Sequence, residues 1–154
     1  MQLLLNVAER LAHMHEAGYV HRDLKPGNVM WLPRENRWTI LDFGCAARVG
    51  VHAPLAYTLV YAPPEVMAAA AAGVRTTVAA PALDAWSLGV LAFELLTGAP
   101  AFRLLTDGRD QVCHQPRNAT LCALHLEVFL LLRIRPPHQK DVQMRSQWFF
   151  WRCS

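Results

Sequence analysis

The sequence has 154 residues, of which 53% are hydrophobic and 18% charged, with a formal net charge of +3. This length fits one domain, and the few, scattered basic residues argue against nucleic acid or an anionic membrane as a partner. The longest apolar run, residues 119–134, is shorter than the roughly 18–20 apolar residues of a membrane span. We therefore expect no membrane span.

Four cysteines are present and none forms a C-x-x-C pair. Polar residues interrupt the early apolar run, which argues against a secretory signal. These features predict an intracellular, cytoplasmic protein without a disulfide framework. A zinc site is the less favoured hypothesis because the spacing of its candidate ligands fits no standard pattern. Those candidates are Cys113, His114, Cys122 and His125.

The first elements are predicted from periodicity. Apolar residues recur at helical spacing over residues 2–17, and Gly18 stands where a helix often ends, so we predict a helix there. A dense polar loop follows at residues 21–28. Two short β-type runs, residues 29–32 and 38–41, flank a turn-rich connection and predict a small hairpin.

A long loop separates this hairpin from the later elements. Residues 66–72 are rich in alanine and predict a short helix that ends at Gly73. Residues 75–81 are interpreted as a loop. Residues 84–97 are apolar on nearly every face, which predicts a central, buried helix. From about residue 103 the composition changes, with Gly, Asp, Gln, His and Arg dominating the next stretch.

Five short motifs occur in a fixed order. HRDLKPGN at residues 21–28 and DFG at residues 42–44 resemble the catalytic loop and the metal-binding element of protein kinases. YAPPE at residues 61–65 resembles the A-P-E element, with Pro in place of its Ala. DAWSLG at residues 84–89 and LTGAPAF at residues 96–102 are similar to the two ends of the family's central helix. Together they make the sequence resemble a eukaryotic-type serine/threonine protein kinase.

The resemblance implies a protein kinase-like α+β fold. Residues 1–102 are expected to form its mostly α-helical C-terminal lobe, with a small β-hairpin, and residues 103–154 a divergent tail. No glycine-rich loop and no V-A-I-K lysine occur in the sequence, so the N-terminal lobe is expected to be absent. A frame change or an alternative exon boundary is our hypothesis for the origin of the tail.

The resemblance also implies chemical roles for single residues. Asp23 would accept the proton of the attacking hydroxyl, and Lys25 would stabilise the transferred phosphate. Asn28 and Asp42 would hold Mg²⁺, and through it ATP, because amide and carboxylate oxygens suit this ion. Thr58 would lie in the substrate pocket and bridge Asp23 and Lys25.

Other residues are expected to support this site. His21 would pack beneath the catalytic loop and steady the metal-binding aspartate. Arg22 would normally pair with a phosphate on the activation segment, but residues 45–57 contain no Ser or Thr and only one Tyr. Glu65 would belong to the activation segment and substrate pocket. Asp84 is predicted to be the N-cap of its helix, and the resemblance adds that its carboxylate holds the catalytic-loop backbone.

The favoured function is transfer of the ATP γ-phosphate to Ser or Thr hydroxyls of protein substrates. An inactive, truncated lobe that binds other proteins is the alternative, and the face left open by a missing lobe would promote such association. A small-molecule phosphotransferase is a third alternative, against which Lys25-Pro26 and residues 61–65 argue. The intact set of chemical residues favours the kinase.

Overall fold

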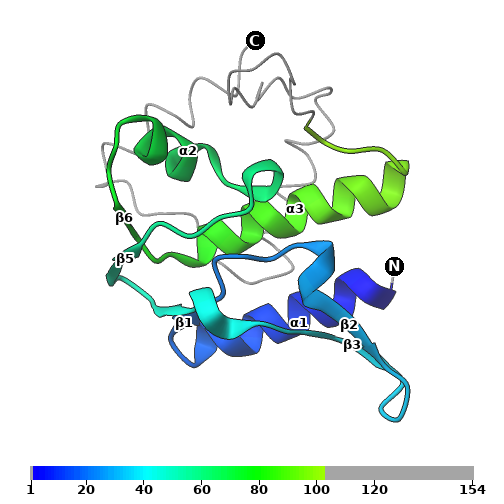
Figure 1. Ribbon diagram of the computed structural model, residues 1–154. Helices are drawn as coiled ribbons and strands as arrows, with labels where there is room; N and C mark the ends of the chain where they lie inside the picture. The colour runs from blue at the N-terminus through cyan, green and yellow to red at the C-terminus, as the bar shows by residue number, and fades with distance from the viewer. Residues whose placement is uncertain (1, 103–154) are drawn as a thin grey trace, which may run out of the picture.

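The computed structural model describes residues 2–102 of the chain. The helices are α1 (Gln2–Glu16), α2 (Pro64–Ala71) and α3 (Pro81–Thr97), and three short 3-10 helices are η1 (Pro26–Asn28), η2 (Phe43–Cys45) and η3 (Leu59–Tyr61). The strands are β1 (Tyr19–Val20), β2 (Val29–Leu32), β3 (Arg37–Ile40), β4 (Ala47–Arg48), β5 (His52–Pro54) and β6 (Thr76–Val78). In Figure 1, α3 crosses the middle of the molecule, with α1 on one side of it and α2 on the other.

The helix predicted over residues 84–97 is confirmed as the centre of the core. Leu88, Val90 and Leu91 of α3 are buried, with exposed fractions of 2%, 0% and 2%. Leu88 and Leu91 pack in one cluster with Val7 and Leu11 of α1. The last turn of α3 is different, because Leu95 and Leu96 are exposed. The apolar residues of α3 are therefore mostly buried as far as Phe93, and those of its last turn are not.

Helix boundaries differ from the predictions by a few residues. The α1 helix ends at Glu16, one residue before the predicted end, and Gly18 adopts a left-handed φ of 83°. Both α2 and α3 begin earlier than predicted, at Pro64 and Pro81. Proline is favoured in the first turn of a helix, because its missing N–H would have no partner there and its φ is already helical.

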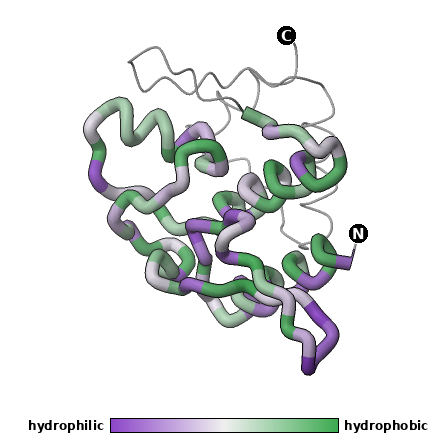
Figure 2. Tube along the Cα trace, turned by 45° about the vertical axis from the view of Figure 1, so that its right-hand side comes forward, coloured by the Kyte–Doolittle hydropathy of each residue, from purple (hydrophilic) through white to green (hydrophobic). Residues whose placement is uncertain are grey.

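The strands pair into three two-stranded antiparallel sheets within residues 2–102: β1 with β4, β2 with β3, and β5 with β6. The β2–β3 hairpin confirms the prediction, and in its register Val29 lies opposite Ile40. Figure 2 shows its hydrophilic tip projecting from the rest of the described chain. Residues 75–81 correct the prediction, because they contain β6. Strands of two or three residues are too short to show an alternating pattern.

No helix among residues 2–102 is long and apolar enough to cross a membrane. The expected tail, residues 103–154, and the cysteine–histidine group proposed as a zinc alternative lie outside the described residues.

Candidate active site

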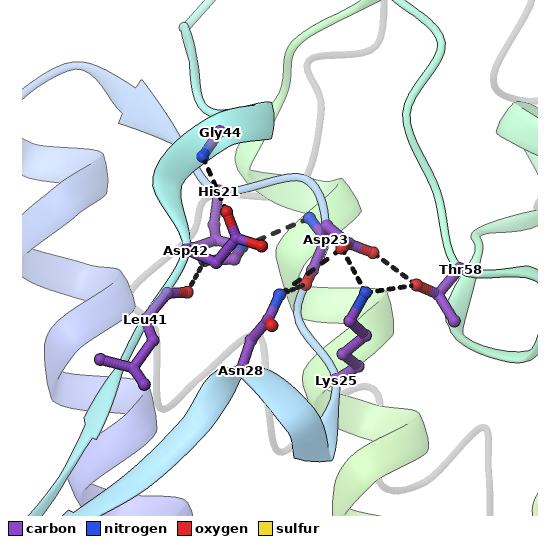
Figure 3. A network of polar contacts seen from close by, with 8 residues as sticks. All are labelled: His21, Asp23, Lys25, Asn28, Leu41, Asp42, Gly44 and Thr58. Atoms are coloured by element: carbon purple, nitrogen blue, oxygen red, sulfur yellow. Dashed lines mark hydrogen bonds and ion pairs between the residues drawn. The ribbon is translucent and has the colours of Figure 1, made fainter.

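The side chains of Asp23, Lys25 and Thr58 form a closed triangle of hydrogen bonds (Figure 3). The Lys25 ammonium donates to Asp23 Oδ2 at 2.7 Å and to Thr58 Oγ1 at 3.0 Å. The Thr58 hydroxyl donates to Asp23 Oδ1 at 2.7 Å. Asp23 and Lys25 come from the loop after β1, whereas Thr58 directly precedes η3. The bridge between acid and lysine that the resemblance implies is therefore present.

The triangle fixes the charge of Lys25. Its pKa is raised above the ordinary value chiefly by the hydrogen bond to Asp23, against a smaller opposing effect of burial, and the charges of Asp23 and Asp42 add to the rise. Lys25 is therefore a cation at neutral pH. Asp23 Oδ2 accepts from Lys25 and, at 3.5 Å, from Asn28 Nδ2, whereas Oδ1 accepts from Thr58 and keeps a further lone pair. Asp23 can thus accept another proton donor without losing its present partners.

Asn28 and Asp42 lie beside the triangle. The buried Asn28 donates from Nδ2 to the main-chain oxygen of Asp23 at 2.8 Å, and no described residue donates to its Oδ1. The charge of Asp42 contributes to the raised pKa of Lys25, so the Asp42 carboxylate lies near the triangle drawn in Figure 3. The carboxylates of Asp23 and Asp42 therefore both act on Lys25, and the Asn28 side chain is bonded to Asp23.

The backbone at Asp42 has an unusual conformation. Its φ of 60° and ψ of 80° are left-handed, and its Oδ1 accepts the Gly44 N–H at 3.2 Å. A non-glycine residue held in this region costs on the order of 1–3 kcal/mol, and such residues concentrate at functional sites. A Cβ at Gly44 would approach Asp42 Oδ1 to 3.1 Å, so glycine leaves room for this turn.

These donors suit Mg²⁺. Among residues 2–102, no three His, Cys, Asp or Glu side chains gather as a potential metal site. Mg²⁺ does not need such a cage, because proteins usually hold it by one or two carboxylates, with water and phosphate oxygens completing the octahedron. Asp42, the Asn28 amide oxygen and the nearby Asp23 match that description in number and type.

His21 lies beneath the loop and has no solvent exposure. Its Nδ1 accepts the Asp23 N–H at 3.3 Å, and its Nε2 donates to the Leu41 carbonyl at 3.0 Å. The ring also meets Phe43 edge-on, with centroids 5.6 Å apart. His21 thus contacts the residues on both sides of Asp42 rather than the carboxylate itself.

Asp84 anchors the loop from below. Its buried carboxylate accepts the backbone N–H groups of His21 and Arg22 at 2.8 and 2.7 Å. This is the contact that the resemblance implies. The predicted capping role is wrong, because Ala80 is the N-cap and Asp84 lies within the first turn of α3. The proline at position 81 starts the helix earlier, and the carboxylate serves a different set of backbone donors.

His15 completes this anchor and was not predicted. Its Nε2 lies 2.8 Å from Asp84 Oδ2, and the His15 side chain is 8% exposed. The sequence held one signal for it, because His15 follows Leu11 by four residues and so continues the buried stripe of α1. The partner lies 69 positions away along the chain, which no local pattern could indicate.

A second unpredicted contact joins η3 to α3. The Tyr61 hydroxyl donates to Glu94 Oε2 at 2.7 Å, and the Ser87 hydroxyl donates to the Tyr61 carbonyl at 3.0 Å. Burial, reinforced by the Glu94 carboxylate, raises the pKa of Tyr61 well above its usual range. These bonds fix η3, which directly follows Thr58, against the central helix.

Glu65 lies in the first turn of α2 and forms no ion pair with any residue from 2 to 102. Burial raises its pKa, and a hydrogen bond from its own backbone N–H opposes that effect only partly. The folded state therefore favours the neutral carboxylic acid more than the unfolded chain does. Its assignment to the substrate pocket stays a prediction.

Replacement of Glu65 by glutamine is expected to stabilise the protein at pH 7 and to leave it unchanged near pH 4. Because the folded pKa is raised, wild-type stability falls as pH rises from about 4.3, the ordinary glutamate value, through the folded pKa. Glutamine carries no charge and removes this loss. Urea unfolding of both proteins at both pH values measures it, with Glu35→Gln as an exposed control. A less stable glutamine variant at pH 7 would show that a cation holds the Glu65 carboxylate as an anion.

Comparison with known proteins agrees with this geometry. A family model described as protein kinase domain matches residues 1–144, which extends beyond the motifs. The chain is 38% identical over 104 residues to a calcium/calmodulin-dependent protein kinase type 1 of Macrobrachium nipponense, covering 65% of this chain and 28% of the relative. It is 36% identical over 99 residues to the human serine/threonine-protein kinase Kist, covering 60% and 23%.

A plant protein gives a similar result. The chain is 36% identical over 102 residues to cyclin-dependent kinase F-3 of Oryza sativa subsp. japonica, covering 64% of this chain and 22% of that protein. The chain thus spans about a quarter of the length of these curated relatives. The matched family model covers most of the chain and includes every residue of the site described above. The chain belongs to the protein kinase family and resembles its serine/threonine branch.

Proposed function

We propose that residues 1–102 are the C-terminal lobe of a serine/threonine kinase domain that transfers the ATP γ-phosphate to Ser or Thr hydroxyls of protein substrates. The observation that carries the proposal is the triangle of Asp23, Lys25 and Thr58 beside Asn28 and Asp42. Phosphoryl transfer depends on positioning and charge neutralisation more than on covalent chemistry by the protein. This group of side chains offers both.

Asp23 is the proposed proton acceptor. Lys25 and Thr58 hold its two oxygens in one orientation, so a substrate hydroxyl can meet a carboxylate whose direction is already fixed. Thr58 belongs to the segment that would face the substrate, and it therefore couples the placement of that segment to the base.

Lys25 and the two metal-binding residues are the proposed charge stabilisers. Lys25 is a cation and can neutralise negative charge that develops on the transferred group. Asn28 and Asp42 would hold Mg²⁺, which in turn binds the phosphates of ATP and neutralises their charge. The hydrogen bond from Asn28 Nδ2 to the Asp23 main chain keeps its amide oxygen available for that purpose.

A protein-binding lobe without catalysis is the second candidate. Large apolar side chains are exposed at Phe43, Leu95 and Leu96, with exposed fractions of 57%, 50% and 56%. Exposed apolar surface promotes association with other proteins. A cytoplasmic location, where ATP is present and the free Cys45 thiol stays reduced, belongs to both candidates. The two differ in whether the chain binds ATP in a way that depends on Mg²⁺.

ATP binding should therefore be measured with and without Mg²⁺ by following backbone amide signals of the loop. We expect weak binding that Mg²⁺ strengthens, and we expect Asp42→Asn to weaken the Mg²⁺-dependent part at least about tenfold. Glu35→Gln makes the same carboxylate-to-amide change at the hairpin tip and should leave binding unchanged. ATP binding with the same affinity with and without Mg²⁺, or binding that Asp42→Asn does not weaken, would favour the second candidate, a protein-binding lobe without catalysis.

A further inference from the structure

Arg22 is a buried cation held by neutral groups. Its exposed fraction is 8%, and its backbone has a left-handed φ of 73°. No carboxylate among residues 2–102 forms an ion pair with its guanidinium. Nη1 instead donates to the Cys45 carbonyl at 3.1 Å, and Nη2 donates to the Pro54 carbonyl. A buried charge is costly unless it is well hydrogen-bonded, so these two bonds matter for the fold.

The two carbonyls bracket one segment of the chain. Cys45 ends η2 and Pro54 ends β5, so Arg22 touches both ends of the stretch that contains β4. These contacts cross 23 and 32 positions of sequence. Hydrogen bonds from a charged donor are stronger than neutral ones, and a planar guanidinium can serve two separate acceptors at once. One side chain therefore fixes the beginning and the end of the segment.

Besides Arg22, short strand pairings and a few backbone hydrogen bonds hold this segment, such as those of the Val49 N–H to the Gly18 carbonyl and the Gly50 N–H to the Ala79 carbonyl. Its strands β4 and β5 have two and three residues and pair only with the equally short β1 and β6. Isolated two-stranded pairs of this length are marginal in water. Beyond Pro54, the Leu55 N–H bonds to the Arg75 carbonyl at 2.8 Å, and Thr58 follows three residues later. The position of Pro54 thus helps to set where Thr58 meets Asp23.

We propose that Arg22 is a positioning residue that clamps residues 45–54 through their backbone carbonyls and so holds Thr58 on Asp23 without a phosphate on that segment. The meaning of the Thr58–Asp23 contact rests on the proposed function, but the clamp itself does not. The composition of the segment agrees, because residues 45–57 offer no Ser or Thr hydroxyl and only that of Tyr57. A backbone carbonyl needs no modifying enzyme, so the segment is ordered as soon as the chain folds.

The first test uses the wild-type protein and observes the guanidinium directly by ¹⁵N–¹H NMR. A clamped Arg22 has hindered rotation about its terminal C–N bonds and gives separate, slowly exchanging Nη signals, which Arg22→Lys assigns by their loss. Exposed arginines such as Arg34 give averaged signals for comparison. Averaged Nη signals from Arg22 would overturn the clamp.

The second test uses amide hydrogen exchange over residues 46–57. Arg22→Lys keeps the charge but reaches only one carbonyl, so exchange in this segment should become at least about tenfold faster, as expected for loss of one charge-assisted bond. The Thr58 methyl signal should shift in the same variant. Arg34→Lys makes the same change on an exposed arginine of the β2–β3 hairpin, outside this segment, and should alter neither readout. Unchanged exchange and an unmoved Thr58 signal in Arg22→Lys would contradict the proposal.

A third arm separates the clamp from an anion site. Addition of inorganic phosphate or phenyl phosphate to the wild-type protein, and replacement of Tyr57 by phenylalanine, should leave exchange in residues 46–57 unchanged. Slower amide hydrogen exchange after addition of phosphate would show that the segment becomes ordered only when Arg22 binds an anion, and the clamp would be wrong. None of these readouts uses ATP, so a failure of Mg²⁺-dependent ATP binding would remove the proposed kinase function and leave the clamp to be judged separately.

Discussion

Replacement of Asp84 by alanine is expected to lower the free energy of unfolding by about 3–5 kcal/mol, because each buried donor left without an acceptor costs about 1–3 kcal/mol. Three donors lose their acceptor at once: the N–H groups of His21 and Arg22 and the His15 ring nitrogen. Because a typical domain is stable by only about 5–15 kcal/mol, this single change removes a large part of the total.

Urea unfolding followed by tryptophan fluorescence measures this loss. Glu35→Ala is the matched control and should cost less than about 1 kcal/mol, because Glu35 is exposed and, among residues 2–102, pairs only with Arg37 at the hairpin tip. His15→Ala should cost less than Asp84→Ala, because the carboxylate then still serves both backbone donors. A loss below about 1 kcal/mol for Asp84→Ala would show that the loop does not depend on this anchor.

The 154-residue polypeptide on its own is expected to transfer phosphate thousands of times more slowly than a kinase that has a glycine-rich loop and a V-A-I-K lysine. Its sequence contains neither element, and these parts orient the ATP phosphates and exclude water from them. Positioning supplies roughly 7–11 kcal/mol of a reduced barrier. Losing half of that slows the reaction thousands-fold, because about 1.4 kcal/mol corresponds to a factor of ten.

Phosphate transfer from ATP to a protein substrate should be measured for the purified polypeptide beside Asp23→Asn. This variant keeps the size of the side chain but removes the carboxylate that would accept the proton. Robust transfer that disappears in Asp23→Asn would contradict the expectation and show that these residues suffice for catalysis. Equal, slight transfer in both proteins would indicate a contaminating kinase and agree with it.

Local patterns in the sequence determined the longer elements and the members of the site. The α1 helix follows from periodicity, the β2–β3 hairpin from two β-type runs around a turn, and the buried α3 helix from apolarity on nearly every face. Each of these signals needs only neighbours a few residues apart. Asp23, Lys25 and Asn28 lie within one eight-residue motif, so the loop that carries them also brings them together. The prediction that Asp42 would join them came from the resemblance of this loop and the D-F-G element to those of protein kinases.

The resemblance already implied that Asp84 holds the backbone of that loop, and only the tertiary structure showed that His15 supports Asp84 and that Arg22 binds main-chain carbonyls. Asp84 meets the backbone N–H groups of residues 21 and 22, and His15 meets Asp84 across 69 positions of sequence. The guanidinium of Arg22 donates to two main-chain carbonyls. Because every residue has a main-chain carbonyl, no residue type in the sequence indicates which two carbonyls are the acceptors. The short strands β1, β4, β5 and β6 could not be predicted from the sequence either. Each has too few residues to show an alternating pattern, and each forms only when its distant partner strand is in place. Periodicity reports the face that a segment buries, whereas long-range hydrogen bonds depend on where the folded chain brings separate backbone groups together.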